Sequence, residues 1–176
     1  MLLNRAYIKI LLFFLGIFFV TIPLNLAKSE TKELDDDKYT LFTGKFDFSD
    51  HGKKSNLIGL EHQSDDLFRN TWMGKILPVT GGLITVDNAI YLYTGVEAEY
   101  NLGILQFKPS FTPGLYQKGS GKDLGFPLEF KSEIEVSLNL TDSTLLGMSY
   151  NHISNASLGT KNPGANNYYF NLLKKF

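Results

Sequence analysis

A histidine and a serine stand two positions apart near the C-terminal end of the chain, at His152 and Ser154. In an extended strand, residues i and i+2 point to the same side and lie roughly 6.5–7 Å apart. An imidazole beside a hydroxyl supplies a general base and a nucleophile together. The spacing therefore indicates nucleophilic catalysis, provided that this segment is a strand.

The segments around the pair do alternate with a period of two. The clearest example is 128–140, where apolar residues mostly occupy the even positions and Glu129, Lys131, Glu133 and Glu135 occupy odd ones. In 144–155 the even positions are mostly large and apolar and include His152 and Ser154, whereas the odd positions are smaller and more polar. A strand places these two sets on opposite faces. The pair therefore belongs to the apolar face of its strand.

Composition narrows the possible classes of protein. The 176 residues include no cysteine, which excludes disulfides and thiolate metal sites, and 17 Lys+Arg oppose 18 Asp+Glu, which argues against a nucleic-acid partner. An aromatic content of 14% argues against disorder. One apolar run cannot build a helical membrane bundle. A strand-rich protein remains, either soluble or embedded in a membrane.

The N-terminal segment is typical of a secretory signal. Arg5 and Lys9 precede the apolar run 10–20, and the small residues Ala27 and Ser29 follow at the expected cleavage site. A single uncleaved helix is the alternative, but the run is shorter than the ~20 apolar residues that a membrane span needs. We predict a signal peptide over 1–29, an acidic leader over 30–37 and one domain over 38–176.

Three features favour an outer-membrane barrel over a soluble sandwich. The 128–140 strand is longer than most soluble strands and carries charges on one face. The chain ends on an alternating segment with a terminal aromatic residue, Phe176, and the signal directs export. We predict an all-β, eight-stranded antiparallel transmembrane barrel whose charged interior is plugged. A bulge or bend is expected at Pro78 and Gly81–Gly82. The predicted strands are 38–49, 55–63, 69–86, 88–101, 102–112, 125–140, 142–155 and 165–176.

The predicted topology indicates in which leaflet of the membrane the His–Ser pair lies. If the N-terminus starts in the periplasm, the seventh strand runs outward, and its end lies at the outer leaflet of the outer membrane of a Gram-negative bacterium. Polar residues at a barrel rim can also simply meet lipid head groups. The pair is therefore either catalytic or interfacial.

The segment His152-Ile-Ser-Asn-Ala-Ser-Leu158, with the Asn162-Pro-Gly164 turn after it, resembles the lipid A 3-O-deacylase family of outer-membrane acyl hydrolases. The similarity extends over about 40–176 and includes 109–116 and 121–130. It implies a Ser–His–acid triad on the outer barrel wall, with Ser154 as nucleophile and His152 as general base. It also implies an oxyanion hole at Asn155.

The sequence departs from the family at the third triad position. The family's Glu corresponds to Asn166, and no Asp or Glu follows Asp142. Asn166 shares a face with Tyr168 and Phe170, so it can adjoin His152. An asparagine can orient an imidazole without carrying charge. Asn155 should point inward by strict alternation, so either the strand ends there or its backbone N–H is the donor.

The resemblance implies an outer-membrane serine esterase that removes the 3-O-linked acyl chain of lipid A and so remodels lipopolysaccharide. An outer-membrane phospholipase and a non-enzymatic barrel for adhesion or structure are the alternatives. The expected partners are lipopolysaccharide, membrane lipid and the barrel-assembly machinery, with the chain a monomer or homodimer. No metal or other cofactor is expected, because His51 and His62 lie far from any ligand cluster.

Overall fold

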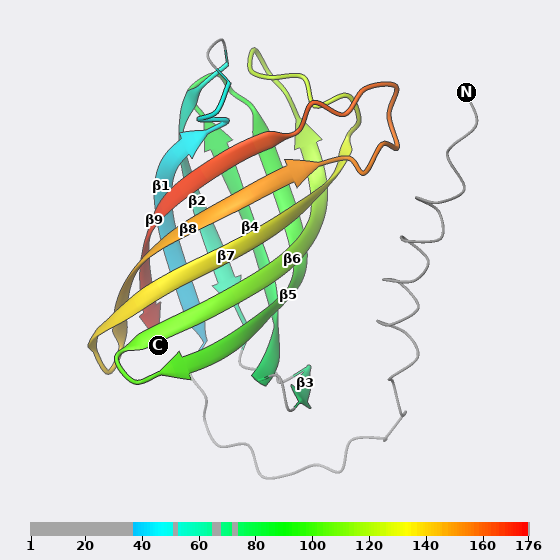
Figure 1. Cartoon of the computed structure of the whole chain (residues 1–176). Coiled ribbons are helices and arrows are strands. Elements are labelled where there is room, and N and C mark those ends of the chain that lie inside the picture. Colours follow the sequence, from blue (N-terminus) through cyan, green and yellow to red (C-terminus); the bar gives the residue numbers. More distant parts are fainter. Residues whose placement is uncertain (1–36, 51–52, 65–67, 72–73, 176) are drawn as a thin grey trace. The chain divides into compact units, whose positions relative to one another are not determined.

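The computed structural model describes residues 37–50, 53–64, 68–71 and 74–175. It forms one antiparallel sheet in the order β2-β1-β9-β8-β7-β6-β5-β4-β3, closed by pairing of β2 with β4. The elements are β1 (Lys38–Phe46), β2 (Ser55–Gln63), β3 (Arg69–Thr71), β4 (Gly74–Thr85), β5 (Ile90–Leu102), β6 (Leu105–Gln117), β7 (Leu128–Thr141), β8 (Thr144–Ser154) and β9 (Ala165–Lys175). Eight long strands make the cylinder and β3 extends β4 only (Figure 1). The predicted eight-stranded barrel is confirmed.

Several predictions concern segments beyond the described residues. The signal peptide over 1–29, the leader apart from Asp37, and the terminal Phe176 all lie outside them, so these stay predictions. No helix in the described part of the chain is long and apolar enough to cross a membrane.

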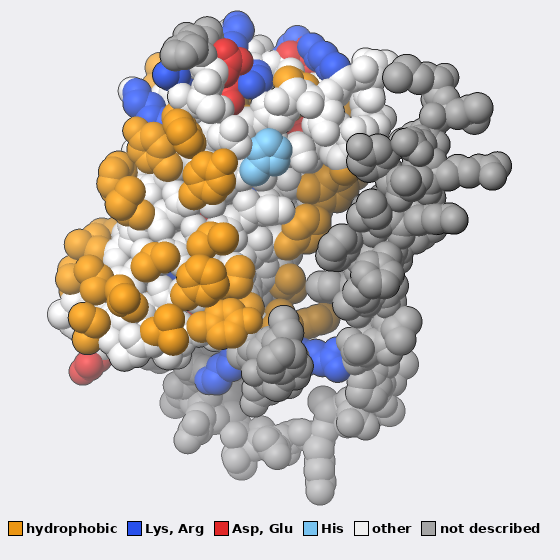
Figure 2. All heavy atoms as spheres, in the orientation of Figure 1, with side chains coloured by type: hydrophobic (Ala, Val, Ile, Leu, Met, Phe, Trp, Pro, Cys, Tyr) orange, Lys and Arg blue, Asp and Glu red, His pale blue; other side chains and the backbone are white. Residues whose placement is uncertain are grey.

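Each strand separates a filled interior from an apolar outer wall. On β7 the odd residues Glu129, Lys131, Glu133 and Glu135 are buried, while even residues such as Ile134 are about half exposed. In Figure 2 hydrophobic side chains cover the barrel wall and charged ones gather at its upper rim. A barrel in a membrane needs this inverted arrangement, because its outer wall meets lipid. The predicted inward orientation of the Glu/Lys ladder is confirmed.

Paired charges fill the middle of the barrel. Lys108 Nζ lies 2.8 Å from Glu135 and 3.6 Å from Glu97. Lys131 Nζ lies 3.4 Å from Glu133 and 4.0 Å from the centre of the Tyr93 ring. Isolated charges would be very costly here, so both lysines need these partners.

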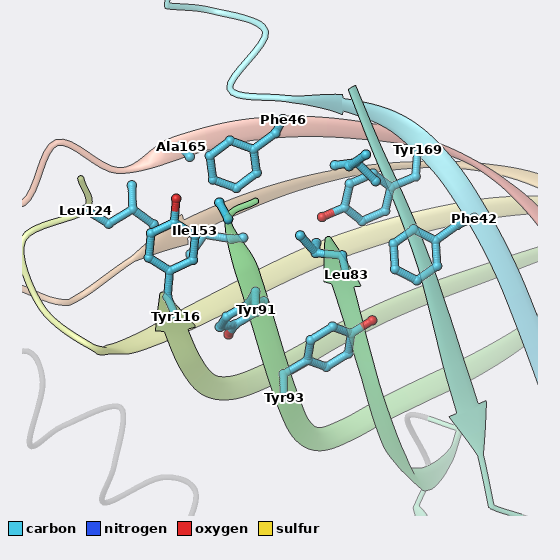
Figure 3. Close-up of a cluster of buried hydrophobic side chains, with 12 residues drawn as sticks. Phe42, Phe46, Leu83, Tyr91, Tyr93, Tyr116, Leu124, Ile153, Ala165 and Tyr169 are labelled. Carbon is cyan, nitrogen blue, oxygen red and sulfur yellow. The ribbon is translucent and has the colours of Figure 1, made fainter. Parts of the chain in front are cut away.

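An aromatic cluster fills the interior next to this charged network (Figure 3). Phe42 stacks on Tyr169 and Phe46 on Tyr116, with ring centroids 4.7 and 5.9 Å apart. Side chains thus occupy the lumen, as expected for a barrel of this size.

The third predicted strand, 69–86, is divided into β3 and β4, and the predicted bulge is wrong. Pairing of β4 with β5 runs without a shift from Lys75 to Ile84, through Pro78 and the two glycines. The glycines make room for side chains of β5 instead. A Cβ on Gly81 would lie 2.7 Å from the Tyr93 hydroxyl, and one on Gly82 would lie 2.7 Å from a Leu92 methyl.

The boundaries around β6 also differ from the prediction. The turn between β5 and β6 lies at 103–104, where Gly103 has φ +68°, rather than between 101 and 102. β6 then continues to Gln117 instead of ending at Thr112. The Pro113–Gly114 pair does not break it, because both residues stay in register with β7.

Candidate active site

Antiparallel pairing of β8 with β9 places His152 directly opposite Asn166. The imidazole Nδ1 lies 2.7 Å from Asn166 Oδ1, on the outer wall of the barrel. A carboxamide oxygen only accepts hydrogen bonds, so this contact is a hydrogen bond in the imidazole tautomer that carries its proton on Nδ1. Nε2 is then the deprotonated nitrogen, as a general base requires. The predicted contact between Asn166 and His152 is confirmed.

Ser154 is the last residue of β8 and lies half-buried on the same face as His152. On the neighbouring strand β7, Phe130 pairs with Ser154 and Ser132 pairs with His152. The chain then leaves the sheet through Ala156 and Ser157, which have φ of +51° and +64°. The candidate nucleophile therefore lies where strand β8 ends and the loop to β9 begins.

Gly164 closes the site from the side of the loop. Its φ is +63°, and a Cβ there would lie 2.7 Å from His152 Cε1 and 3.0 Å from Nε2. Any other residue would be strained and would also push the imidazole away. Sequence reasoning found only a turn at this glycine, whereas the structure shows that the glycine makes space for the ring.

Asn155 is fully buried and holds two loops together. Its Nδ2 donates to the carbonyl oxygens of Leu124 at 2.8 Å and Lys161 at 2.9 Å. Its Oδ1 accepts from Ser157 N–H at 2.9 Å, and its own backbone N–H donates to Asn162 Oδ1 at 3.1 Å. The strand does end before Asn155 and its side chain does point inward. Its donors all have protein partners in this state.

The loop after β1 contacts Asn166, which sequence reasoning missed. Phe48 N–H donates to the Asn166 carbonyl at 2.9 Å, and Asn166 Nδ2 donates to Ser49 Oγ at 3.0 Å. Tyr150, on β8, donates its hydroxyl to Asn166 Oδ1 at 3.1 Å. Both ends of the carboxamide therefore have partners in addition to His152.

One acid does lie near the third triad position, but it belongs to this loop. Asp47 is buried with φ +50°, and its carboxylate lies 3.4 Å from Asn166 N. Lys122 Nζ contacts Asp47 at 2.5 Å and Asp50 at 3.3 Å. The lysine balances the charge of Asp47. The Asp47 carboxylate contacts the backbone N–H of Asn166. The side-chain carboxamide of Asn166 is therefore the group that contacts the imidazole.

Apolar side chains border the site. The Phe48 ring packs against Tyr150 and Tyr168, with centroids 6.1 and 5.4 Å away. Below His152, the outward residues of β8 are Tyr150, Met148 and Leu146, all about half exposed. These side chains form an apolar strip that continues along the barrel wall from the His–Ser pair, and an acyl chain can pack against it.

Charged pairs hold the neighbouring loops. Lys161 Nζ lies 3.0 Å from Asp123, and Gly125 N–H donates to the same carboxylate at 2.9 Å. These hydrogen bonds, that of Lys161 first, lower the pKa of Asp123 to about 2. Nothing in the described ranges brings three or more His, Asp or Glu side chains together as metal ligands.

The fold and its outward polar pair define a transmembrane β-barrel of the outer-membrane type. The sequence model of the family described as "Lipid A 3-O-deacylase (PagL)" matches residues 38–175. The chain belongs to this family, and it is accordingly an ester hydrolase of the outer membrane that acts on lipid A.

Solved structures agree with the fold. The chain is similar to the crystal structure of the outer-membrane enzyme PagL, with 17% identity and a TM-score of 0.60, over 79% of this chain and 99% of that one. A de novo designed transmembrane β-barrel gives 9% identity and a TM-score of 0.54, over 84% of this chain and 100% of that one. No curated protein matches.

Proposed function

We propose that Ser154, His152 and Asn166 carry out the deacylation as an uncharged triad. The carrying observation is the 2.7 Å contact from His152 Nδ1 to Asn166 Oδ1, beside a serine on the same outer face. It leaves Nε2 free to accept the Ser154 proton.

The reaction then runs in two steps. Ser154 Oγ attacks the ester carbonyl carbon while His152 Nε2 takes its proton. The bond to the sugar oxygen breaks, that oxygen receives the proton, and the acyl group remains on Ser154. Water, deprotonated by His152, next attacks the carbonyl carbon of the acyl-serine. The bond from that carbon to Ser154 Oγ breaks, His152 returns the proton to Oγ, and the fatty acid leaves.

The oxyanion requires a donor near Ser154, and Asn155 remains our candidate. Its backbone N–H is the nearer choice, because its side chain is directed into the loop contacts. Asn162 Oδ1, which now accepts from that N–H at 3.1 Å, would have to turn away when the ester arrives. Such a donor is worth about 3–4 kcal/mol in comparable sites.

The 3-O position is the ester that we propose for cleavage, with lipopolysaccharide reaching the wall laterally through the leaflet. The apolar strip formed by Tyr150, Met148 and Leu146 supports this approach. The alternating last strand supports insertion by the barrel-assembly machinery. We propose a monomer or homodimer.

The test is the Ser154→Ala variant, assayed by mass spectrometry of lipid A from cells that express it. We expect loss of the deacylated species while the folded barrel persists in outer-membrane fractions. Phospholipid analysis of the same cells separates a phospholipase from a lipid A deacylase. Continued deacylation by the folded variant would overturn the assignment of Ser154.

A further inference from the structure

An asparagine in a triad raises a problem that a carboxylate does not. A carboxylate presents an oxygen in either orientation, whereas a carboxamide has one oxygen and one NH₂ group. If the Asn166 amide turned over, its NH₂ would face His152 Nδ1, which would have to accept. The proton would then reside on Nε2, and this tautomer cannot take the proton of Ser154.

The structure shows a contact at each end of this amide. Oδ1 accepts from His152 Nδ1 at 2.7 Å and from the Tyr150 hydroxyl at 3.1 Å. Nδ2 donates to Ser49 Oγ at 3.0 Å. The Ser49 loop is itself fixed on β9, because Phe48 N–H donates to the Asn166 carbonyl at 2.9 Å.

A hydroxyl can donate or accept, so the direction of these bonds is decided together with the imidazole. During the reaction His152 becomes an imidazolium, and Nδ1 can then only donate. Oδ1 must face it, and Nδ2 must find its acceptor on the opposite side. Ser49 Oγ is positioned to be that acceptor.

We propose that Ser49 is a positioning residue, which with Tyr150 holds Asn166 Oδ1 toward His152 and so selects the catalytic tautomer. The proposal rests on the proposed function, since it needs His152 as base and Asn166 as its partner. It assigns the loop after β1 a role in the chemistry of a site formed by β8 and β9.

The kinetic test compares Ser49→Ala in two backgrounds, the natural chain and Asn166→Asp. Aspartate has the size of asparagine but two equivalent oxygens, so it should not need Ser49. We expect Ser49→Ala to lower kcat about 3- to 10-fold in the natural chain, with KM unchanged, and less than about 1.5-fold in the Asn166→Asp background. Ser49→Thr, which keeps the hydroxyl, should restore the rate.

A matched control is Ser143→Ala. This serine lies in the turn between β7 and β8, at the opposite end of the barrel. Its Oγ also takes part in a hydrogen bond, which it accepts from Lys174 Nζ on β9 at 2.7 Å. We expect no change in its kcat. Equal losses for Ser49→Ala in both backgrounds would mean that Ser49 is merely structural, and no loss in either would also overturn the proposal.

A second measurement does not depend on activity. The ¹⁵N shifts of the His152 ring in detergent micelles report which nitrogen carries the proton. We expect the Nδ1–H tautomer in the natural chain and a mixture in Ser49→Ala; identical spectra would overturn the proposal. An enzyme that needs Ser154 but ignores Ser49 would refute only this inference, whereas activity without Ser154 would refute the proposed function.

Discussion

Two polar contacts between β8 and β9 lie one residue apart and face opposite ways. Asn151 points into the barrel, where Asn167 Nδ2 donates to its Oδ1 at 2.7 Å and it donates to Glu133 at 2.9 Å. His152 points outward, and its Nδ1 lies 2.7 Å from Asn166 Oδ1. The inner contact is fully buried and belongs to a charged network, whereas the outer one is uncharged and has an exposed imidazole.

The difference shows that charged and uncharged polar groups occupy separate faces of this small barrel. Charges inside can be paired with neighbours from many strands, and they fix the packing of the lumen. Charges on the outer wall would meet lipid, where they are costly. The proposed triad of Ser154, His152 and Asn166 contains no carboxylate. The polar contact on the wall is thus uncharged, while the paired carboxylates and lysines of the strands lie in the lumen, away from lipid.

The strongest test of this difference is to replace the adjacent residues Asn151 and His152 separately with alanine. We expect His152→Ala to lower the deacylation rate at least about 10³-fold without lowering the unfolding temperature, because it removes the base. Asn151→Ala should do the reverse and destabilise the barrel by about 1–3 kcal/mol, since Glu133 loses a donor. Rates on lipid A in detergent and heat-modifiability on gels provide both readouts. Similar profiles for the two variants would contradict the division.

The next largest effect concerns the interior network. Lys131→Met leaves Glu61 and Glu133 without their shared cation. We expect the free energy of unfolding to fall by about 3–5 kcal/mol, while the activity per folded molecule is unchanged. Urea unfolding in lipid vesicles measures it.

Lys118→Met is the matched control for that loss. Its ion pair with Asp123 is exposed, and we expect a change below about 1 kcal/mol. If both lysines proved equally dispensable, the buried network would not stabilise the barrel as argued.

The third prediction tests the neutral triad. We expect Asn166→Ala to slow deacylation about 10- to 100-fold, because His152 loses the acceptor that holds its tautomer. Asn166→Glu should retain activity or raise it, since a carboxylate also stabilises the imidazolium. Initial rates on purified lipid A decide the matter, and near-full activity of the Ala variant would remove Asn166 from the site.

The smallest effect is at the rim. Because the pKa of Asp123 is lowered to about 2, its ion pair with Lys161 stabilises the folded loop above about pH 4 and is lost as pH falls through about 2. A carboxyl ¹³C titration in micelles measures this. Lys161→Ala should raise the pKa toward its usual value, and a titration that the variant leaves unchanged would refute the pairing.

The inward and outward faces could be predicted because a barrel strand has only two environments. The alternation of 128–140 is therefore sufficient to assign Glu133 to the lumen and Ile134 to the wall. The pairing of His152 with Asn166 followed from the faces of neighbouring strands. Strand ends were harder, since Pro113–Gly114 has the composition of a turn but stays in β6.

The support around Asn166 could not be predicted. Ser49 and Asp47 lie 117 and 119 residues away from it in the sequence, and Lys122 reaches Asp47 over 75 residues. No periodic pattern connects such positions. They meet only in the folded barrel, where β1 pairs with β9 although the two strands are far apart in the sequence.

The exposed outward face of β8 also determines which measure of substrate concentration governs the reaction rate. Lipid that reaches His152 and Ser154 along this wall diffuses in two dimensions within one leaflet, so its encounter frequency depends on its mole fraction among the surrounding lipids. Diluting mixed micelles with buffer should therefore leave the rate unchanged, while adding inert detergent at a fixed amount of lipid A should lower it. For this enzyme the membrane serves as the solvent of the reaction.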